Sequence, residues 1–191
     1  MKGINKMLLL LAAGMFVFVG VQGEPPLKGD PPSGDAWVDS FPVPAGNPAQ
    51  LFYVQRTPNV NTIVYELNYR DGVFDEDEPV HVFWIRYGDK GQKAELSFIQ
   101  EKFAYGIRVK LLEKGKYDLR FVSYRKYQIL LQKGVDGRYR AYASINQKTV
   151  MLNRIFISIH GGSFWSPNIE YIEITGTDPA TGKEVTERMK V

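Results

Sequence analysis

Three arginines have the clearest chemical potential in this chain, because the alternation of the predicted strands places each of them on an otherwise apolar face. They are Arg86 in the predicted strand 80–87, Arg120 in 117–125 and Arg154 in 149–159. An arginine is costly to bury unless a carboxylate, a set of carbonyl groups or a bound anion faces it. The positions therefore predict either internal pairing with acids such as Glu66 and Glu173, or a pocket in which the guanidinium groups bind a small anionic or amphipathic molecule.

The loop 160–168, with the sequence HGGSFWSPN, is the second candidate. Its adjacent glycines resemble the oxyanion loop of lipases and esterases, and His160 could act as a general base with Glu101 or Glu173 as its partner. Those enzymes also need a G-x-S-x-G nucleophile turn, which this chain lacks. The loop therefore supports a hydrolase only as an alternative. Its aromatic residues predict either a ligand platform that includes Trp165 or a plug for the core.

These observations together predict a non-catalytic binding site and no catalytic residue. The predicted ligand-binding residues are Trp84, Arg86, Arg120, Arg154, His160 and Trp165. Trp84 belongs to this set because it shares the strand face of Arg86. A shift of one residue in strand register would move each arginine to the opposite face, so the prediction depends on the register.

Metal and cofactor chemistry has little support in the composition. The chain has no cysteine and two histidines, which removes disulfides, thiolate zinc sites, iron–sulfur clusters and multi-histidine centres. The acidic segment 71–78 lacks the spacing of a calcium-binding loop, so we expect a solvated loop and no metal or other cofactor. Tyrosines and arginines interleave at 138–142, but an exported protein rarely meets nucleic acid, and we expect no such partner.

The segments that carry these candidates predict a mainly β domain, antiparallel and barrel-like or a sandwich, with one amphipathic helix packed at one end. Turn-like sequences separate ten predicted strands: 51–56, 62–69, 80–87, 107–113, 117–125, 127–133, 138–145, 149–159, 169–175 and 185–190. We expect the helix at 94–105, where Leu96, Ile99 and Phe103 recur at helical spacing and would face the sheet. Gly106 would end the helix in a conformation with positive φ.

The first 23 residues have the pattern of a secretory signal peptide. Lys2 and Lys6 precede an apolar run at 7–21, and small residues follow at a cleavage position before Glu24. The run is shorter than the about 20 residues that a membrane span needs, so we expect no stable span after cleavage. Residues 24–40 are rich in proline and glycine and predict a linker or strap, followed by a single domain at 41–191. The expected location is periplasmic or secreted.

Charge is unevenly distributed along the chain. Residues 24–101 carry 6 Lys/Arg and 13 Asp/Glu, whereas residues 102–154 carry 13 Lys/Arg and 3 Asp/Glu. The simpler interpretation is cross-strand pairing between acidic early strands and basic middle strands. The alternative is a surface module that binds anionic lipid or polysaccharide through the basic block 102–154.

Several segments resemble an uncharacterised family of exported bacterial proteins, the domain of unknown function four-eight-three-three. The segments are 41–48 (FPVPAGNP), 61–68 (NTIVYELN), 80–87, 102–106 (KFAYG), 119–124 (LRFVSY), 153–156 (NRIF) and 161–168 (GGSFWSPN). The resemblance covers nearly all of 41–191 and implies export and a single-domain build. It implies no activity, so the expected function is a binding or structural role in the cell envelope, and the oligomeric state stays open.

Overall fold

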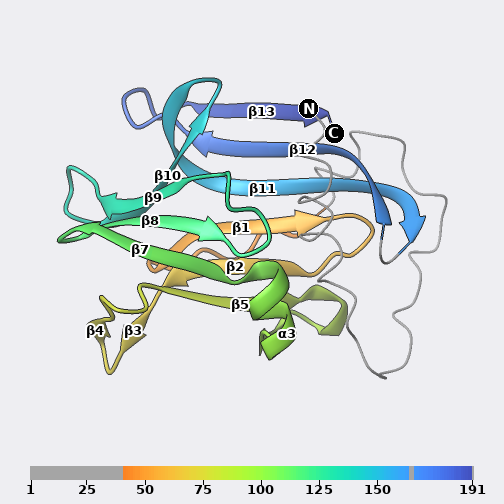
Figure 1. Cartoon of the computed structure of the whole chain (residues 1–191), viewed down its shortest axis with the longest axis horizontal. Coiled ribbons are helices and arrows are strands. Elements are labelled where there is room, and N and C mark those ends of the chain that lie inside the picture. The colour runs from red at the N-terminus through yellow and green to blue at the C-terminus, as the bar shows by residue number, and fades with distance from the viewer. Residues whose placement is uncertain (1–40, 164–165, 191) are drawn as a thin grey trace.

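The computed structural model describes residues 41–163 and 166–190, and in this part of the chain the structure is mainly β (Figure 1). The predicted fold class is confirmed, and each of the ten predicted strand segments contains a strand. The strands are β1 (Gln50–Arg56), β2 (Thr62–Leu67), β3 (Tyr69–Arg70), β4 (Val73–Phe74), β5 (Val80–Arg86), β6 (Gln92–Glu95), β7 (Ile107–Glu113), β8 (Lys116–Phe121), β9 (Ile129–Lys133), β10 (Tyr139–Ile145), β11 (Lys148–Ser163), β12 (Ser166–Thr177) and β13 (Glu184–Lys190). The helical turns are η1 (Tyr87–Asp89), α3 (Phe98–Gln100) and η2 (Glu101–Tyr105).

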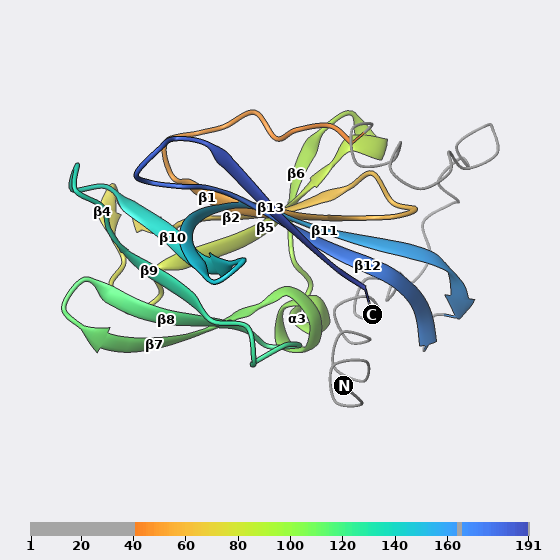
Figure 2. The ribbon, with the colours of Figure 1, turned by 90° about the horizontal axis from the view of Figure 1, so that it is seen from above.

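The long strand β11 joins two lobes of one curled sheet. Its first residues pair with β10 and its middle residues pair with β1, while β12 and then β13 continue the sheet on its other side. One lobe therefore has the order β6-β5-β2-β1, and the other has the order β10-β9-β8-β7. Figure 2 shows the helix α3 carrying the chain from the first lobe to the second.

One pair of strands in the mainly antiparallel sheet runs parallel. β1 and β11 run parallel, with Tyr53 opposite Arg154 and Arg56 opposite Ile157. The whole second lobe lies between these two strands in the sequence, and a parallel pair needs such a long connection. The other strand pairs in the described residues are antiparallel, as expected.

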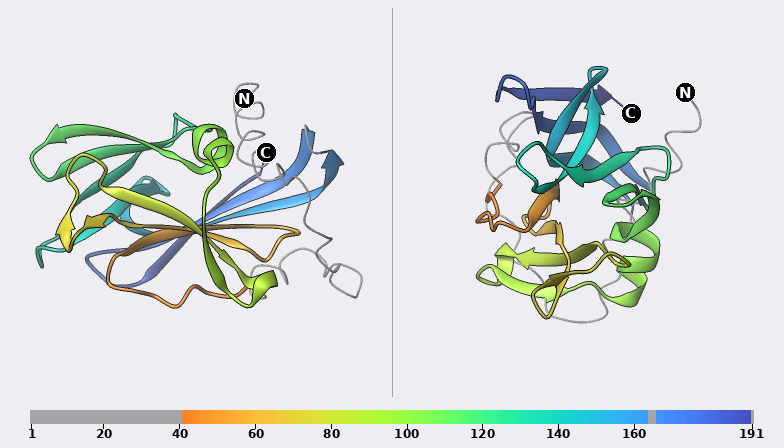
Figure 3. Two further views of the ribbon diagram at one scale, coloured as in Figure 1. Left: turned by 90° about the horizontal axis from the view of Figure 1, so that it is seen from below. Right: turned by 90° about the vertical axis from the view of Figure 1, so that its left-hand side faces the viewer.

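The core fills the space between the two lobes. Phe52 of β1 stacks on Tyr65 of β2 with ring centroids 4.5 Å apart, and both rings contact the edge or face of Phe121 from β8. Gly176 lets β12 cross close to the bend in β11, because an added Cβ there would lie 2.6 Å from a side-chain carbon of Val150. The end view in Figure 3 shows the helix at the side of the molecule, between the lobes.

The helix is shorter than predicted, and its orientation is not the predicted one. Residues 94–95 belong to β6, so the helix begins after Ser97 and ends at Tyr105. Ile99 and Phe103 are exposed, whereas Gln100 is buried. Phe103 lies in a π-helical turn, whose wider repeat moves it off the face that the apolar spacing predicts. Ser97 and Gln100 form a capping box that ties down the first turn.

Gly106 ends the helix for a different reason from the one expected. Its φ is −58°, a value open to any residue, so positive φ is not its role. An added Cβ would lie 2.1 Å from the carbonyl oxygen of Glu101, which accepts the Gly106 N–H. A side chain therefore does not fit where the helix turns into β7.

The predicted signal peptide (1–23) and the linker or strap (24–40) lie outside the described residues. Among the residues that are described, none of the helices has the length and apolar character needed to cross a membrane.

Candidate functional site

A groove of about 420 Å³ opens where the edges of the two lobes meet. One wall comes from the start of β5, at Val80–Val82, because β6 pairs with β5 only from Phe83 onward. The other wall comes from β7, which pairs with β8 and with no other strand in the described chain. The half-barrel is therefore left open along a seam between β5 and β7.

The groove has an apolar floor and an acidic rim. Its apolar lining residues are Val80, Val82, Leu96, Ile107 and Val109. Its acidic lining residues are Asp77, Glu78, Glu95 and Glu101, and the described lining residues include no lysine or arginine, although Arg70, outside the lining, pairs with Glu78 at 3.1 Å. Asn68, His81 and Gly106 complete the lining. The groove is thus suited to a molecule with an apolar body and positive charge.

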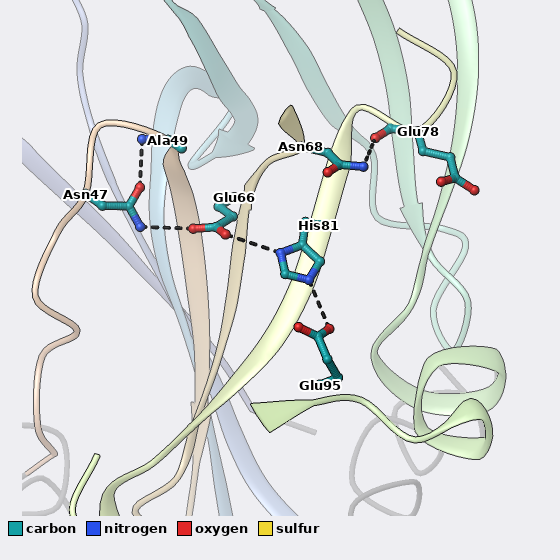
Figure 4. A network of polar contacts seen from close by, with 7 residues as sticks. All are labelled: Asn47, Ala49, Glu66, Asn68, Glu78, His81 and Glu95. Carbon is teal, nitrogen blue, oxygen red and sulfur yellow. Dashed lines mark hydrogen bonds and ion pairs between the residues drawn. The ribbon is translucent and has the colours of Figure 1, made fainter. Parts of the chain in front are cut away.

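His81 lies at the centre of a polar network beside the groove (Figure 4). Its Nδ1 is 3.2 Å from Glu66 Oε1, and its Nε2 is 3.0 Å from Glu95 Oε2. The amide of Asn47 donates to the second oxygen of Glu66 at 2.9 Å and accepts from the Ala49 N–H at 2.7 Å. Four segments of the first lobe are thereby joined through one imidazole.

The two carboxylates decide the charge of His81. Partial burial lowers the pKa of His81, but the hydrogen bonds and negative charges of Glu95 and Glu66 outweigh this effect, so the pKa is raised overall. Below this raised pKa the protonated imidazole binds both carboxylates. Above its pKa the imidazole becomes neutral, and the groove becomes more negative.

The acidic rim of the groove is ordered by its own backbone. The carboxylate of Asp75 accepts the N–H groups of Asp77 and Glu78 at 3.1 and 3.0 Å. The bond from Glu78, assisted by the bond from Asp77 and by the nearby Arg70 guanidinium, lowers the pKa of Asp75. Just before this turn, Phe74 stacks on Tyr139 of the second lobe, with centroids 4.5 Å apart. The loop is largely exposed, as expected, and these contacts also give it a defined shape. Within the described residues, no group of three or more His, Cys, Asp or Glu side chains is placed to hold a metal ion.

The predicted arginines do not gather in one place. Arg86 continues the inner strand face of Trp84, which is buried in the core, and lies 3.8 Å from the carboxylate of Asp89. Arg120 alternates with the buried Leu119 and Phe121, so it points to the outer face. There it donates to Asp118 at 2.9 Å and to the carbonyl of Arg125 at 2.7 Å.

Arg154 lies on the outer face because of a β-bulge. The register between β11 and β12 shifts between Leu152 and Arg154, so that Leu152 and Ile155 both reach the core. The guanidinium carbon of Arg154 lies 4.9 Å from the ring of Phe156, which packs in a separate outer cluster with Phe41 and Tyr171. No residue pattern in the sequence indicates this bulge, and without it Arg154 would face the core.

The loop predicted to carry hydrolase chemistry is only partly described. His160 is exposed, and in the described residues no hydrogen bond or ion pair joins it to Glu101 or Glu173. Glu101 lines the groove instead, and Glu173 accepts two hydrogen bonds from Arg188 at 3.0 and 2.7 Å. Trp165 lies outside the described residues.

Sequence reasoning missed the residues that build the groove. The link between His81 and Glu66 depends on the β2–β5 register, in which these two residues face each other directly. The long acidic segment was the visible signal, but its position against β7 could not be read from the chain. Arg56 was also not predicted as a special residue. The structure buries it at the end of β1, with its Nη1 3.4 Å from the carbonyl oxygen of Thr57.

The basic block of the sequence forms much of the second lobe. Arg120 pairs with Asp118, Arg140 with Asp136, and Lys116 with Glu113, so its ion pairs lie within the block. The expected pairing between early acidic strands and middle basic strands is not the arrangement found for these three residues.

The chain was also compared with known proteins. A family model described as a domain of unknown function, DUF4833, matches residues 52–188. No curated protein and no solved structure matches the chain. The matched segment includes the whole groove and both lobes of the sheet.

Proposed function

This protein belongs to the DUF4833 family, whose description carries no activity, and we propose from the groove itself that it is a non-catalytic binding protein for a cationic amphipathic molecule. The observation that carries the proposal is the composition of the lining: four carboxylates around five apolar side chains, without lysine or arginine. Ligand sites combine an apolar surface with a few well-placed polar groups in this way.

The charge of the groove favours a cation over the anion suggested by the arginine positions. Asp77 and Glu78 precede β5, whereas Glu95 and Glu101 lie around the helix, so carboxylates flank the apolar floor at both ends. An amine or guanidinium group would be attracted by these carboxylates, and an alkyl or aromatic body would bury apolar surface at about 25 cal/mol per Å². A carboxylate ligand would meet like charge.

The chemistry of the lining favours binding over catalysis. The described lining residues include no Ser, Thr, Tyr, Cys or Lys, so they offer no hydroxyl, thiol or amine nucleophile. The imidazole of His81 is engaged on both nitrogens by Glu66 and Glu95. The N-terminal pattern of residues 1–23 supports a further part of the proposal, that the protein is exported and acts in the cell envelope.

Calorimetric titration with octylamine and octanoate tests the charge preference, because the two molecules share an alkyl chain and differ in sign. We expect octylamine to bind, and octanoate to bind at least about tenfold more weakly. Glu95→Gln and Glu78→Gln should each weaken octylamine binding several-fold. Glu184→Gln removes an exposed carboxylate on β13 and should leave it unchanged. Equal or tighter binding of octanoate would overturn the proposal.

A further inference from the structure

We propose that the natural ligand is an extended peptide segment that adds to the free edge of β7 and closes the seam of the half-barrel. This inference rests on the proposed function and specifies the class of the ligand. It follows from the backbone edges of the groove, the apolar face behind them and the spacing of the carboxylates.

Two strand edges border the groove, and both lack a second neighbour among the described residues. β7 pairs with β8 from Ile107 to Glu113, and no strand of the described residues 41–163 and 166–190 lies beside its opposite edge. Residues Val80–Val82 of β5 pair with β2 and have no second neighbouring strand in the described chain, because β6 pairs with β5 only from Phe83 onward. Such edges present unpaired N–H and C=O groups and readily accept another strand.

The inner face of β7 is apolar but uncovered. Ile107, Val109 and Leu111 lie directly opposite Phe121, Leu119 and Tyr117 of β8, which are buried. Val109 is nevertheless 37% exposed and Leu111 is 60% exposed. One further strand in the seam would lie beside these side chains and continue the core face of the second lobe toward β5.

The positions of the carboxylates indicate where the peptide should carry basic residues. Glu78 lies two residues before β5, and Glu95 lies opposite Phe83 of β5, so the two acids flank the free edge Val80–Val82 (Figure 4). Positions 78 and 83 are separated by about 17 Å along an extended chain, at about 3.3 Å per residue. A matching peptide would carry two basic residues about five positions apart, with uncharged residues between them.

Other occupants fit the seam less well. The chain's own segment 24–40 has four prolines, four acids and one lysine, so four of its positions have no amide donor and its net charge is negative. A second copy that paired through its own β7 would bring Arg108 and Lys110 of the two copies together, and like charges facing across strands are destabilising. A peptide with basic ends avoids both problems.

Binding of a designed peptide tests the inference. The probe is an acetylated and amidated hexapeptide with lysine at each end and alternating valine and threonine between them. Two further versions carry N-methyl groups on alternate backbone nitrogens, one version for each edge of the peptide. We expect the parent peptide to bind and at least one N-methylated version to bind at least about tenfold more weakly.

Hydrogen–deuterium exchange locates the binding. Peptide binding should slow exchange of the amides at 107–113 and leave those of a distant edge strand, β13 at 184–190, unchanged. If both N-methylated peptides bind like the parent, or if exchange at 107–113 does not change, strand addition is refuted. Octylamine binding that depends on Glu95 would still support the proposed function in that case. Protection of 107–113 in the protein alone, equal to that of β8, would show that the edge is already covered by a second copy or by segment 24–40, and would also overturn the inference.

Discussion

Replacing His81 with glutamine should change how the stability of the protein depends on pH. In the folded protein the two carboxylates raise the pKa of this imidazole above its ordinary value, which is also its value in the unfolded chain. A base with a raised pKa stabilises the folded state while it is protonated. The contribution is complete below about pH 6.5, and it is lost as the pH rises through the higher pKa of the folded state.

The size of the effect follows from the exposure of the three side chains. The exposed fraction is 37% for His81, 17% for Glu66 and 75% for Glu95. Solvent-exposed ion pairs contribute about 0.2–1 kcal/mol each, and the exposed Glu95 belongs at the lower end of that range. We therefore expect the wild type to lose about 0.5–1.5 kcal/mol of unfolding free energy, relative to His81→Gln, between about pH 5.5 and about pH 8.5. For a domain of this size, this difference corresponds to a few degrees in Tm.

Urea unfolding at several pH values, combined with a double-mutant cycle between His81→Gln and Glu66→Gln, measures the effect. The coupling free energy should be present at the acidic end and should fade at the basic end. His160→Gln is the control, because it removes the other imidazole of the chain, which is exposed. A coupling energy that stays constant across this pH range, or a pH profile that His160→Gln alters as much as His81→Gln, would refute the assignment of a charged His81 to this network.

Three further substitutions test the elements that hold the groove and the lobes. Ser97→Ala removes the capping box and should lower the free energy of unfolding in urea by about 1 kcal/mol. It should also weaken octylamine binding, because the helix carries part of the acidic rim. Ser97→Asp should retain most of the stability. Tyr65→Phe removes a buried hydrogen bond of 2.9 Å to the carbonyl of Tyr105 and should lower the free energy of unfolding by about 1–2 kcal/mol. A change below a few tenths of a kcal/mol would show that this bond does not connect the lobe to the helix. Arg188→Leu leaves the buried carboxylate of Glu173 without its two hydrogen bonds from Arg188 and should cost about 1–3 kcal/mol, whereas adding Glu173→Leu should recover much of the loss.

The sequence was sufficient to predict the strands, because alternation and turn residues act locally. Strand 107–113 has the same bounds in the prediction and in the structure, and the other nine differ at their ends. The helix was misjudged because pairing of residues 92–95 with β5 is a tertiary contact, which delays the start of the helix to Ser97. The apolar periodicity of one segment carries no information about its pairing with another segment.

The candidate site was harder to predict, because face assignment requires exact register. Counting in twos from Leu152 places Arg154 in the core, and a single bulged residue moves it to the outer face. The groove depends on residues still more distant in sequence, at the start of β5 and on β7. Nothing local in Val80 or Val109 indicates that these residues will line one cavity.

The uneven charge along the chain becomes a difference in charge between the two lobes of the sheet. Each lobe is built from one continuous stretch of sequence, so the acidic residues between 66 and 101 give their charge to the first lobe, and the basic block 102–154 gives its charge to the second. The seam is the boundary between these two regions. A cationic ligand is therefore attracted to the acidic wall at β5, while Arg108 and Lys110, exposed on β7, disfavour its basic groups along the other wall.

A peptide with charge only at its ends is compatible with both walls, whereas a uniformly basic peptide would bring its central charges close to Arg108 and Lys110. Placing a third lysine at the centre of the hexapeptide should for this reason weaken binding, and the loss should shrink in Lys110→Gln.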